Sequence, residues 1–393
     1  MRLILITQDF PPEVGGIQTY SYEYARQLSK YCDYFAVIAP SKPDSELTDK
    51  KLDFPVFRFN ISNSLLFLKL YRELGNIVEE NSIDATFHAQ WHTILPAASL
   101  RNKGKLGKVF CAVHGRELLF NPYHKKFILE NIYNRYRKNS LQKVDHLYPV
   151  SDFTSKELEK YGIEKDKKTV QHNGTDLSQF NKNLVDEKSR KRIIERYNLS
   201  GKKVVLTVCR LVSRKGVDIV IKAIKKLSDK YPDLIYIVIG SGPEMDRYKE
   251  LARNLAVDDK VIFTGRVEDE KEFIAFYDVS DVFVMVPRSG KSNVEGFGIV
   301  YLEANAFGLP VIGSKSGGIP SAIADGETGL LVDEDNPEQL ASALDKLLDN
   351  RDYARKLGNN GLMRIKNELN WKVLGKKLYD DLQKKVSQTN GNA

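Results

Sequence analysis

Two glutamates separated by seven residues, Glu295 and Glu303, lie in the stretch RSGKSNVEGFGIVYLEANAFGLPVIGSKSGG. Apolar residues recur with helical spacing over residues 299–306, so a helix is predicted there. Glu295 would then precede the helix N-terminus, and Glu303 would lie about two turns further along. By spacing alone, two such carboxylates also fit a solvent-exposed helix face.

The amides that open this predicted helix are the second feature of the stretch. The N–H groups of Phe297, Gly298 and Ile299 have no acceptor within the helix, and they lie at its positive end. Such groups hold phosphates or other polar oxygens. Together with the two carboxylates, they predict a cradle for a nucleotide sugar.

Arg210 and Lys215 form a candidate cation pair. Arg210 ends a predicted strand over residues 204–209, and Lys215 precedes a helix that starts near Val217. Two cations at a strand tip can neutralise a diphosphate without a metal ion, and Arg214 is a secondary contributor. In a chain with 60 lysines and arginines, a solvated pair is the alternative interpretation.

Two candidates lie in the first half of the chain. Gly15 and Gly16 follow an apolar strand at residues 3–7 and precede a helical pattern, a geometry that presents backbone N–H groups to a phosphate or sugar. His114 follows the strand in KVFCAVHG, so it would lie at the sheet edge where ligands of parallel sheets bind. A lone histidine is more often structural.

The elements needed to position these residues alternate between strand and helix along the whole chain, which predicts an α/β fold with parallel sheets. A chain of 393 residues suits two domains, each a doubly wound sheet. We place the first domain at residues 1–183 and the second at 184–370. Residues 371–393 form a last helix beginning at Trp371, with a tail from Gln388.

The net charge of +8 is concentrated in the first domain. Residues 101–143 hold eleven lysines and arginines against two glutamates. Within them, residues 123–143 interleave Tyr123, Phe127, Ile128, Ile132, Tyr133 and Tyr136 with Lys125, Lys126, Arg135, Arg137 and Lys138, as a helix on an anionic membrane surface would. The alternative is a helix packed on its own domain with a solvated basic face. No nucleic-acid motif accompanies the charge, so nucleic acid is not an expected partner.

Several classes are not expected. No run of about 18 apolar residues predicts a membrane span, and the N-terminus reads as a strand and its loop rather than a signal, which favours the cytoplasm. Cys32, Cys111 and Cys209 are scattered, so neither a disulfide framework nor a zinc site is indicated. His88 and His92 have the spacing of a helical metal pair but no local third ligand.

Five ordered motifs carry a family resemblance: DFPPEVGGIQTY, AVHGRE, RLVSRKG, IVIGSGPE and VEGFGIVYLEA. They resemble retaining glycosyltransferases of family 4, which have the GT-B fold, and in particular the phosphatidylinositol mannoside mannosyltransferases of that family. The resemblance implies two Rossmann-like domains facing across a cleft. The N-terminal domain would bind the acceptor and the C-terminal domain the nucleotide sugar. The last helix would cross back to the N-terminal domain.

The resemblance also implies residue roles. Catalytic roles fall on Arg210, Lys215, Glu295 and His114. Glu303 would accept hydrogen bonds from the ribose, and the loop at Arg266 and Val267 would contact the base. The full donor-binding set is Gly15, Gly16, Arg210, Lys215, Arg266, Val267, Glu295, Phe297, Gly298, Ile299 and Glu303, with no metal ligand and no cofactor.

The implied reaction is retaining transfer of a hexose, with mannose from GDP-mannose as the first choice, to a lipid-linked or glycan acceptor without a metal. The enzyme would be cytoplasmic and peripheral on the inner face of the plasma membrane. UDP-glucose or UDP-N-acetylglucosamine is the alternative donor, for cell-envelope polysaccharide synthesis. A sugar-nucleotide epimerase of the same fold, or a non-catalytic nucleotide-sugar binder, is the alternative class.

Overall fold

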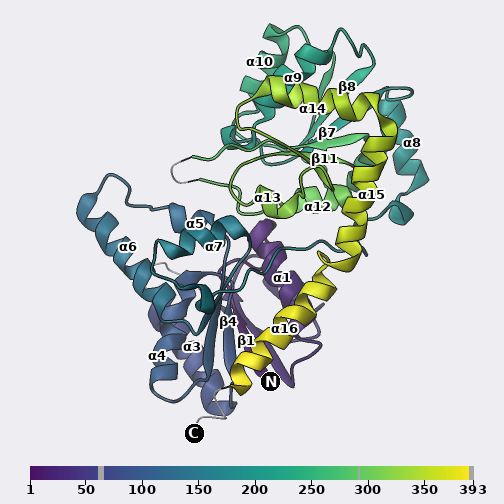
Figure 1. Cartoon of the computed structure of the whole chain (residues 1–393). Coiled ribbons are helices and arrows are strands. Elements are labelled where there is room, and N and C mark those ends of the chain that lie inside the picture. The colour runs from purple at the N-terminus through teal and green to yellow at the C-terminus, as the bar shows by residue number, and fades with distance from the viewer. Residues whose placement is uncertain (61–65, 291–292, 389–393) are drawn as a thin grey trace. The chain divides into compact units, whose positions relative to one another are not determined.

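The structure is a computed structural model that describes residues 1–60, 66–290 and 293–388. Its contacts divide the chain into two units (Figure 1). The first is Met1–Asn173 with the segment from Trp371 onward, and the second is Gly174–Asn370. The sequence analysis placed the border after residue 183. Residues 174–183 group with the second unit, where Phe180 contacts Phe273 and Tyr277.

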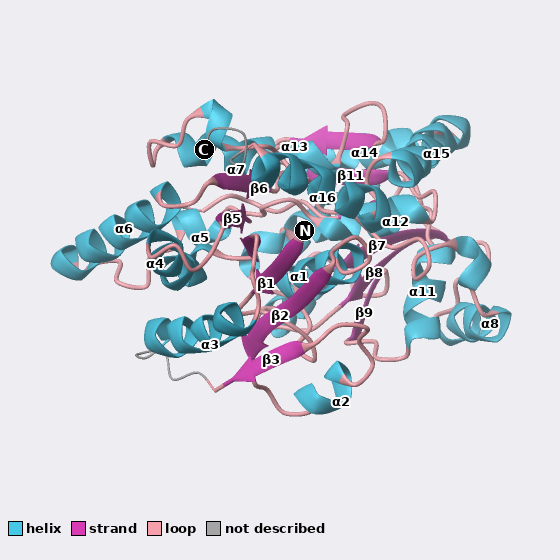
Figure 2. Ribbon diagram, turned by 90° about the horizontal axis from the view of Figure 1, so that it is seen from below, coloured by secondary structure: helices cyan, strands magenta, loops and turns pink. Residues whose placement is uncertain are grey.

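The first unit is built on a parallel sheet of six strands in the order β3-β2-β1-β4-β5-β6. Ile6 of β1 pairs with both Ile38 of β2 and His88 of β4, so β1 is central. Figure 2 shows β1, β2 and β3 side by side. This is the doubly wound order expected from alternating strands and helices. The strands are β1 (Arg2–Ile6), β2 (Tyr34–Pro40), β3 (Val56–Phe59), β4 (Ala85–His88), β5 (Lys108–Val113) and β6 (His146–Pro149).

Helices cover this sheet because each carries an apolar face that it buries. Leu70, Leu74 and Ile77 of α3 lie four and three residues apart, and all three belong to the buried core. The helices are α1 (Gly16–Leu28), α2 (Ser45–Asp49), α3 (Leu66–Glu80), α4 (Ile94–Asn102), α5 (Arg116–Leu119), α6 (Phe127–Gln142), α7 (Asp152–Glu159) and α16 (Trp371–Ser387). The predicted start of α3 at Leu65 and the predicted tail after Gln388 lie outside the described residues.

The last helix, α16, belongs to the first unit and packs on α1, as the sequence predicted (Figure 1). Trp371 contacts the rings of Tyr20 and Tyr24, with centroids 6.3 and 5.4 Å apart. A β-carbon on Gly375 would lie 2.3 Å from Cβ of Gln27, so only glycine allows this approach.

The second unit repeats the architecture, with strands in the order β12-β11-β10-β7-β8-β9. All described pairs are parallel, which confirms two Rossmann-like sheets. The strands are β7 (Lys203–Val208), β8 (Leu234–Ile239), β9 (Val261–Gly265), β10 (Val282–Val284), β11 (Val311–Ser314) and β12 (Gly329–Val332). The helices are α8 (Glu187–Arg196), α9 (Val217–Leu227), α10 (Met245–Asn254), α11 (Glu270–Asp278), α12 (Ile299–Ala306), α13 (Ile319–Ala322), α14 (Pro337–Asp349) and α15 (Arg351–Asn367).

The strand order reverses between β7 and β10, which are hydrogen-bonded neighbours. Crevices at such reversals, beyond the carboxyl ends of the strands, are where doubly wound sheets bind ligands. The chain after β7 carries Arg210 to Lys215, and the chain after β10 carries Glu295 and leads into α12. Topology therefore brings the two predicted groups of the second unit to the same edge.

Candidate functional site

The centre of the candidate site is Glu295 with two cations. Its Oε2 accepts hydrogen bonds from Nη1 of Arg214 and Nζ of Lys215, each at 2.6 Å. The Glu295 side chain is only 16% exposed and that of Lys215 only 11%, so solvent screens these contacts weakly. Oε1 of Glu295 makes no hydrogen bond within the described part of the chain. It remains free to accept one.

The two cations control the ionisation of Glu295. Burial by itself would raise the pKa of the carboxyl group, but the charges of Lys215 and Arg214 and their hydrogen bonds lower it to about 2. Glu295 is therefore an anion throughout the physiological range.

The structure pairs Lys215 with Arg214 rather than with Arg210. Arg210 is exposed and makes no side-chain hydrogen bond or ion pair with any described residue. Its backbone remains in the same loop, because its carbonyl accepts from the Val212 amide at 2.9 Å. The cation that the sequence analysis treated as secondary, Arg214, thus contacts Glu295, while Arg210 stays available in solvent.

The loop from Arg210 to Lys215, here called the cation loop, is fixed by a glycine against the chain that follows β10. Gly216 has φ +73° and caps α9 immediately after Lys215. A β-carbon there would lie 2.0 Å from the carbonyl oxygen of Val286, which follows β10. Only glycine permits this packing. The packing fixes the position of the loop from which the Lys215 side chain extends to Glu295.

Gly216→Ala is expected to destabilise the second unit by at least about 2 kcal/mol, because it combines a left-handed backbone with a clash against main chain. Thermal unfolding followed by circular dichroism measures this. Gly201→Ala is the matched control, since Gly201 has φ +70° but a β-carbon on it would meet no other atom within 4 Å. Equal losses for the two variants would contradict the role of the Val286 contact.

The backbone of Glu295 is held by a second glycine turn. The Gly318 amide donates to the Glu295 carbonyl at 2.8 Å. Gly317 has φ +50°, and a β-carbon on it would lie 2.5 Å from the same carbonyl oxygen. Gly298, with φ +96°, caps α12 next to Tyr301. The glycines of the sequence motif therefore position the carboxylate, while Gly298 and Ile299 supply first-turn amides without an acceptor four residues earlier.

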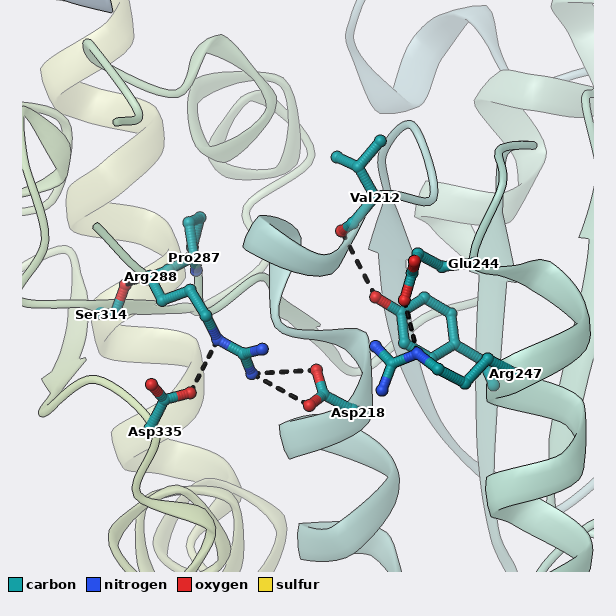
Figure 3. A network of polar contacts seen from close by, with 9 residues as sticks. Val212, Asp218, Glu244, Arg247, Pro287, Arg288, Ser314 and Asp335 are labelled. Carbon is teal, nitrogen blue, oxygen red and sulfur yellow. Dashed lines mark hydrogen bonds and ion pairs between the residues drawn. The ribbon is translucent and has the colours of Figure 1, made fainter. Parts of the chain in front are cut away.

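Arg288 joins the loop of Arg214 and Lys215 to the loop that carries Glu295, and Figure 3 shows its side chain between Asp218 and Asp335. Its amide donates to the Arg214 carbonyl at 2.9 Å. Its guanidinium contacts both oxygens of Asp218 at 3.0 Å and pairs with Asp335 at 2.7 Å. The sequence analysis did not single out Arg288, since its carboxylate partners lie 70 and 47 residues away in the chain.

Glu303 lies on α12 and contacts an aromatic residue of α11. Its Oε2 accepts from the hydroxyl of Tyr277 at 2.9 Å. Burial raises the pKa of Glu303 to about 7, and the hydrogen bond from Tyr277 opposes this in part. Unlike Glu295, this carboxyl group changes charge near neutral pH.

The ribose-binding role that the family resemblance implies for Glu303 predicts that nucleotide affinity falls about tenfold between pH 8 and pH 6, because a protonated Glu303 would no longer accept from ribose hydroxyls as a carboxylate. Titration calorimetry across this range measures it, and Glu303→Gln should remove the pH dependence. Between pH 4.5 and about 7, the carboxyl group of Glu303 is protonated in the folded protein but ionised in the unfolded chain. Its contribution to the stability of the folded state is therefore lost as pH rises through about 7. An unchanged pH profile in the variant would assign the effect to another group.

The predicted base-contacting loop follows β9. Gly265 has φ +74°, and its carbonyl accepts from the Gly240 amide at 2.8 Å, which joins this loop to the turn after β8. Arg266 is exposed and Val267 half-buried. Arg266 makes no side-chain ion pair or hydrogen bond with the residues that the structure describes.

In the first unit, the predicted residues cluster at the start of α1. Gly15 caps this helix, and a β-carbon on it would lie 2.4 Å from Oε1 of Gln18, whereas Gly16 is exposed with open space around it. His114 is 9% exposed; its Nε2 contacts the Ala89 carbonyl at 2.9 Å, and its ring packs edge-on against Tyr20 of α1. His114 is thus already engaged structurally on one nitrogen.

The metal pair considered at His88 and His92 is occupied by protein partners. His88 bonds Thr93 at 2.8 Å and Thr86 at 3.0 Å, and burial lowers its pKa to about 3. His92 contacts the hydroxyl of Tyr133 at 3.2 Å. Among the residues described, no group of three or more histidine, cysteine, aspartate or glutamate side chains is arranged to hold a metal ion.

The basic segment forms helix α6 and exposes apolar side chains. Phe127 is 80% exposed, Ile128 72% and Ile132 60%. Arg137 is an exception to the predicted pattern, because it is buried and donates to the carbonyls of Glu117 and Phe120 at 2.8 and 2.9 Å. Helix α6 therefore packs on its own domain through Arg137, while Phe127, Ile128 and Ile132 remain exposed. None of the helices in the described ranges has the length and apolar character needed to cross a membrane.

Comparison with known families matches both units. Residues 14–179 match the family described as Glycosyltransferase Family 4, and residues 189–364 match Glycosyl transferases group 1. The chain belongs to the glycosyltransferases that combine these two domains, and it is an enzyme. Its two Rossmann-like units are those of the GT-B fold.

More particular similarities extend over nearly the full length. A GDP-mannose-dependent alpha-(1-6)-phosphatidylinositol monomannoside mannosyltransferase of Mycolicibacterium smegmatis is 29% identical over 96% of this chain and 97% of its own. A GDP-mannose-dependent monoacylated alpha-(1-6)-phosphatidylinositol monomannoside mannosyltransferase of Corynebacterium glutamicum is 29% identical over 97% of this chain and 98% of its own. Among solved structures, Anabaena HepE in complex with UDP superposes with a TM-score of 0.80 at 18% identity, covering 98% of this chain and all of that one.

Proposed function

We propose that this enzyme transfers mannose from GDP-mannose to a phosphatidylinositol mannoside type of lipid, with retention at the anomeric carbon and without a metal ion. The observation that carries the proposal is the similarity, over nearly the whole chain, to two mannosyltransferases named for this donor and this class of acceptor. The geometry of the second unit supplies groups suited to each part of such a donor.

The diphosphate is assigned to the cation loop. Lys215 and Arg214 are fixed on Glu295, and Arg210 lies exposed five residues before Lys215. As the glycosidic bond lengthens, negative charge grows on the leaving diphosphate. Cations already fixed there stabilise the transition state more than the ground state, by about 3 kcal/mol for one such contact. Cations in this role replace the metal ion that other enzymes use.

The sugar and nucleoside are assigned to the neighbouring groups. Oε1 of Glu295 and the first-turn amides of α12 would bind sugar hydroxyls, with the buried side chain of Phe297 anchoring that loop. Glu303 would accept from the ribose, and Arg266 with Val267 would contact the base. In the first unit, we assign donor binding to Gly15 and Gly16 and a catalytic role to His114.

Retention would follow a front-face path. Among the residues that the structure describes, no carboxylate besides Glu295 and Glu303 stands out as a nucleophile, and we assign both of these to donor binding. The leaving phosphate would therefore take the proton of the acceptor hydroxyl. An inverted product, identified by proton NMR of the anomeric centre, would contradict this path.

The test of the donor is titration calorimetry of the purified protein in EDTA with GDP and UDP in parallel. Tighter binding of GDP, followed by transfer of mannose from GDP-mannose to a phosphatidylinositol mannoside, is the expected result. The control is Glu303→Gln, which should weaken both nucleotides. A requirement for added divalent metal would contradict the assignment of the cation loop.

A UDP-sugar donor is the second candidate, favoured by the superposition on HepE, which is solved with UDP. Preference for UDP in the same titration would establish it. The fold and the cation loop would keep their roles, and only the base and sugar would change.

We propose that the enzyme meets its lipid acceptor at a membrane surface, which it would contact through α6. Phe127, Ile128 and Ile132 would enter the headgroup region, while exposed Lys125, Lys126, Arg135 and Lys138 would contact lipid phosphates. We therefore propose that the enzyme is a peripheral protein on the inner face of the plasma membrane.

A further inference from the structure

A pocket in the second unit lies apart from Glu295, Arg214 and Lys215. Its volume is about 580 Å³, within the range of small-molecule sites. Three segments line it: residues 177–183, residues 306–308 at the end of α12, and α15. Helices α12 and α15 pack against each other in this unit (Figure 1). The pocket is thus at the opposite end of α12 from Gly298.

The charged side chains that line the pocket are all positive. Lys182 comes from the first segment, and Arg355 and Lys366 come from α15. Lys182 and Lys366 make no side-chain hydrogen bond or ion pair with any residue that the structure describes. Among those described residues, Arg355 has one ion pair, an exposed contact with Asp352 at 3.7 Å. An oxyanion entering here meets three cations without displacing a strong internal ion pair.

The remaining lining suits a hydroxylated molecule rather than a bare anion. Carboxamides both donate and accept hydrogen bonds, and Leu177, Phe307 and Leu362 add an apolar wall for the carbon face of a ring. The carboxamides that line the pocket are Asn183, Asn359 and Asn181, of which Asn181 already donates to the Leu177 carbonyl at 2.6 Å and accepts from the Asn183 amide at 2.8 Å.

The pocket wall connects to a residue of the candidate donor site. The ring of Phe307 stacks on Tyr277, with centroids 5.3 Å apart and planes 13° apart. The hydroxyl of Tyr277 donates to Glu303. A molecule that contacts Phe307 is therefore separated by one aromatic ring from Tyr277, the hydrogen-bond partner of Glu303.

From these contacts we infer a second ligand site in this pocket, for a small phosphorylated sugar, whose occupancy is coupled to nucleotide binding through Phe307 and Tyr277. The first part does not depend on the identity of the donor. The coupling rests on the proposed role of Glu303.

Titration calorimetry with glucose 6-phosphate tests the site on the full chain. Lys366→Glu and Arg355→Glu are each expected to raise the Kd at least about tenfold, because a like charge replaces a phosphate contact. Lys356→Glu, which carries the same charge change on α15 outside the pocket, should leave the Kd unchanged, as should Lys215→Ala. Thermal unfolding checks that each variant is folded.

Three results would overturn the site: no saturable binding by the wild-type protein, equal affinity in the pocket variants, or loss of binding in Lys215→Ala, which would place the sugar phosphate in the donor site. Inorganic phosphate that binds as tightly as glucose 6-phosphate would overturn the sugar assignment. Saturating glucose 6-phosphate should also change the GDP or UDP affinity by about fivefold in the wild type and not in Lys366→Glu. If only this last effect is missing while binding is confirmed, the coupling through Tyr277 is wrong.

Discussion

Replacing Lys215 with alanine is expected to lower kcat/KM for glycosyl transfer by about 10²- to 10³-fold, since the variant loses a fixed charge at the place where, in the proposed mechanism, the leaving diphosphate becomes negative. Glu295 stays ionised, because Arg214 still contacts it at 2.6 Å. The loss should therefore fall mainly on kcat, with a smaller change in donor KM.

Steady-state kinetics with saturating acceptor measures this effect, and Lys225→Ala is the matched control. Lys225 is an exposed lysine of α9 that takes no part in the contacts among Arg214, Lys215 and Glu295. A Lys215→Ala enzyme with a kcat within about threefold of the wild type would show that this cation does not act on the leaving group.

The triple change Phe127→Ser, Ile128→Ser and Ile132→Ser is expected to weaken binding to phosphatidylinositol-containing vesicles about 100-fold, because it removes three apolar side chains that would enter the headgroup region. All three are more than half exposed, so their replacement should not disturb the core. Vesicle co-sedimentation at fixed salt measures the effect.

The control for this prediction changes as many exposed apolar residues elsewhere: Leu47→Ser, Leu184→Ser and Met363→Ser. This second triple variant should bind vesicles like the wild type. Equal vesicle binding by the α6 variant and the wild type would show that α6 packs on its own domain and does not bind the membrane. Transfer to a water-soluble acceptor should be unaffected by either triple change.

Much of the fold could be predicted because strands and helices alternate with clear periodicity. The helix predicted over residues 299–306 has those same bounds in the structure, and the strand predicted over residues 3–7 is β1, Arg2–Ile6. Strand β3, Val56–Phe59, was not predicted. It pairs on one side only, with β2, and carries Arg58, which ion-pairs with Asp49 at 2.7 Å, so it lacks the apolar run of a central strand.

The candidate site was less predictable, because its geometry depends on contacts distant in sequence. Glu295 and Glu303 could be selected from one motif, yet their environments differ: one is held by two cations and the other is buried beside a tyrosine. The partners of Glu295 lie about 80 residues earlier in the chain. Hydrophobic periodicity gives no information about contacts between residues so far apart. The preference for Arg214 over Arg210 as that partner follows from the loop that Gly216 packs against Val286, a contact between segments 70 residues apart.

The return of α16 to the first unit has a consequence for synthesis on the ribosome. The second unit is one continuous segment, Gly174–Asn370, whereas the first needs Trp371 and the helix that follows it. Until that helix leaves the exit tunnel, Tyr20 and Tyr24 of α1 lack the indole ring they pack against. The unit translated first is therefore the last whose core can close, and a nascent chain stalled before Trp371 would present this apolar face to chaperones.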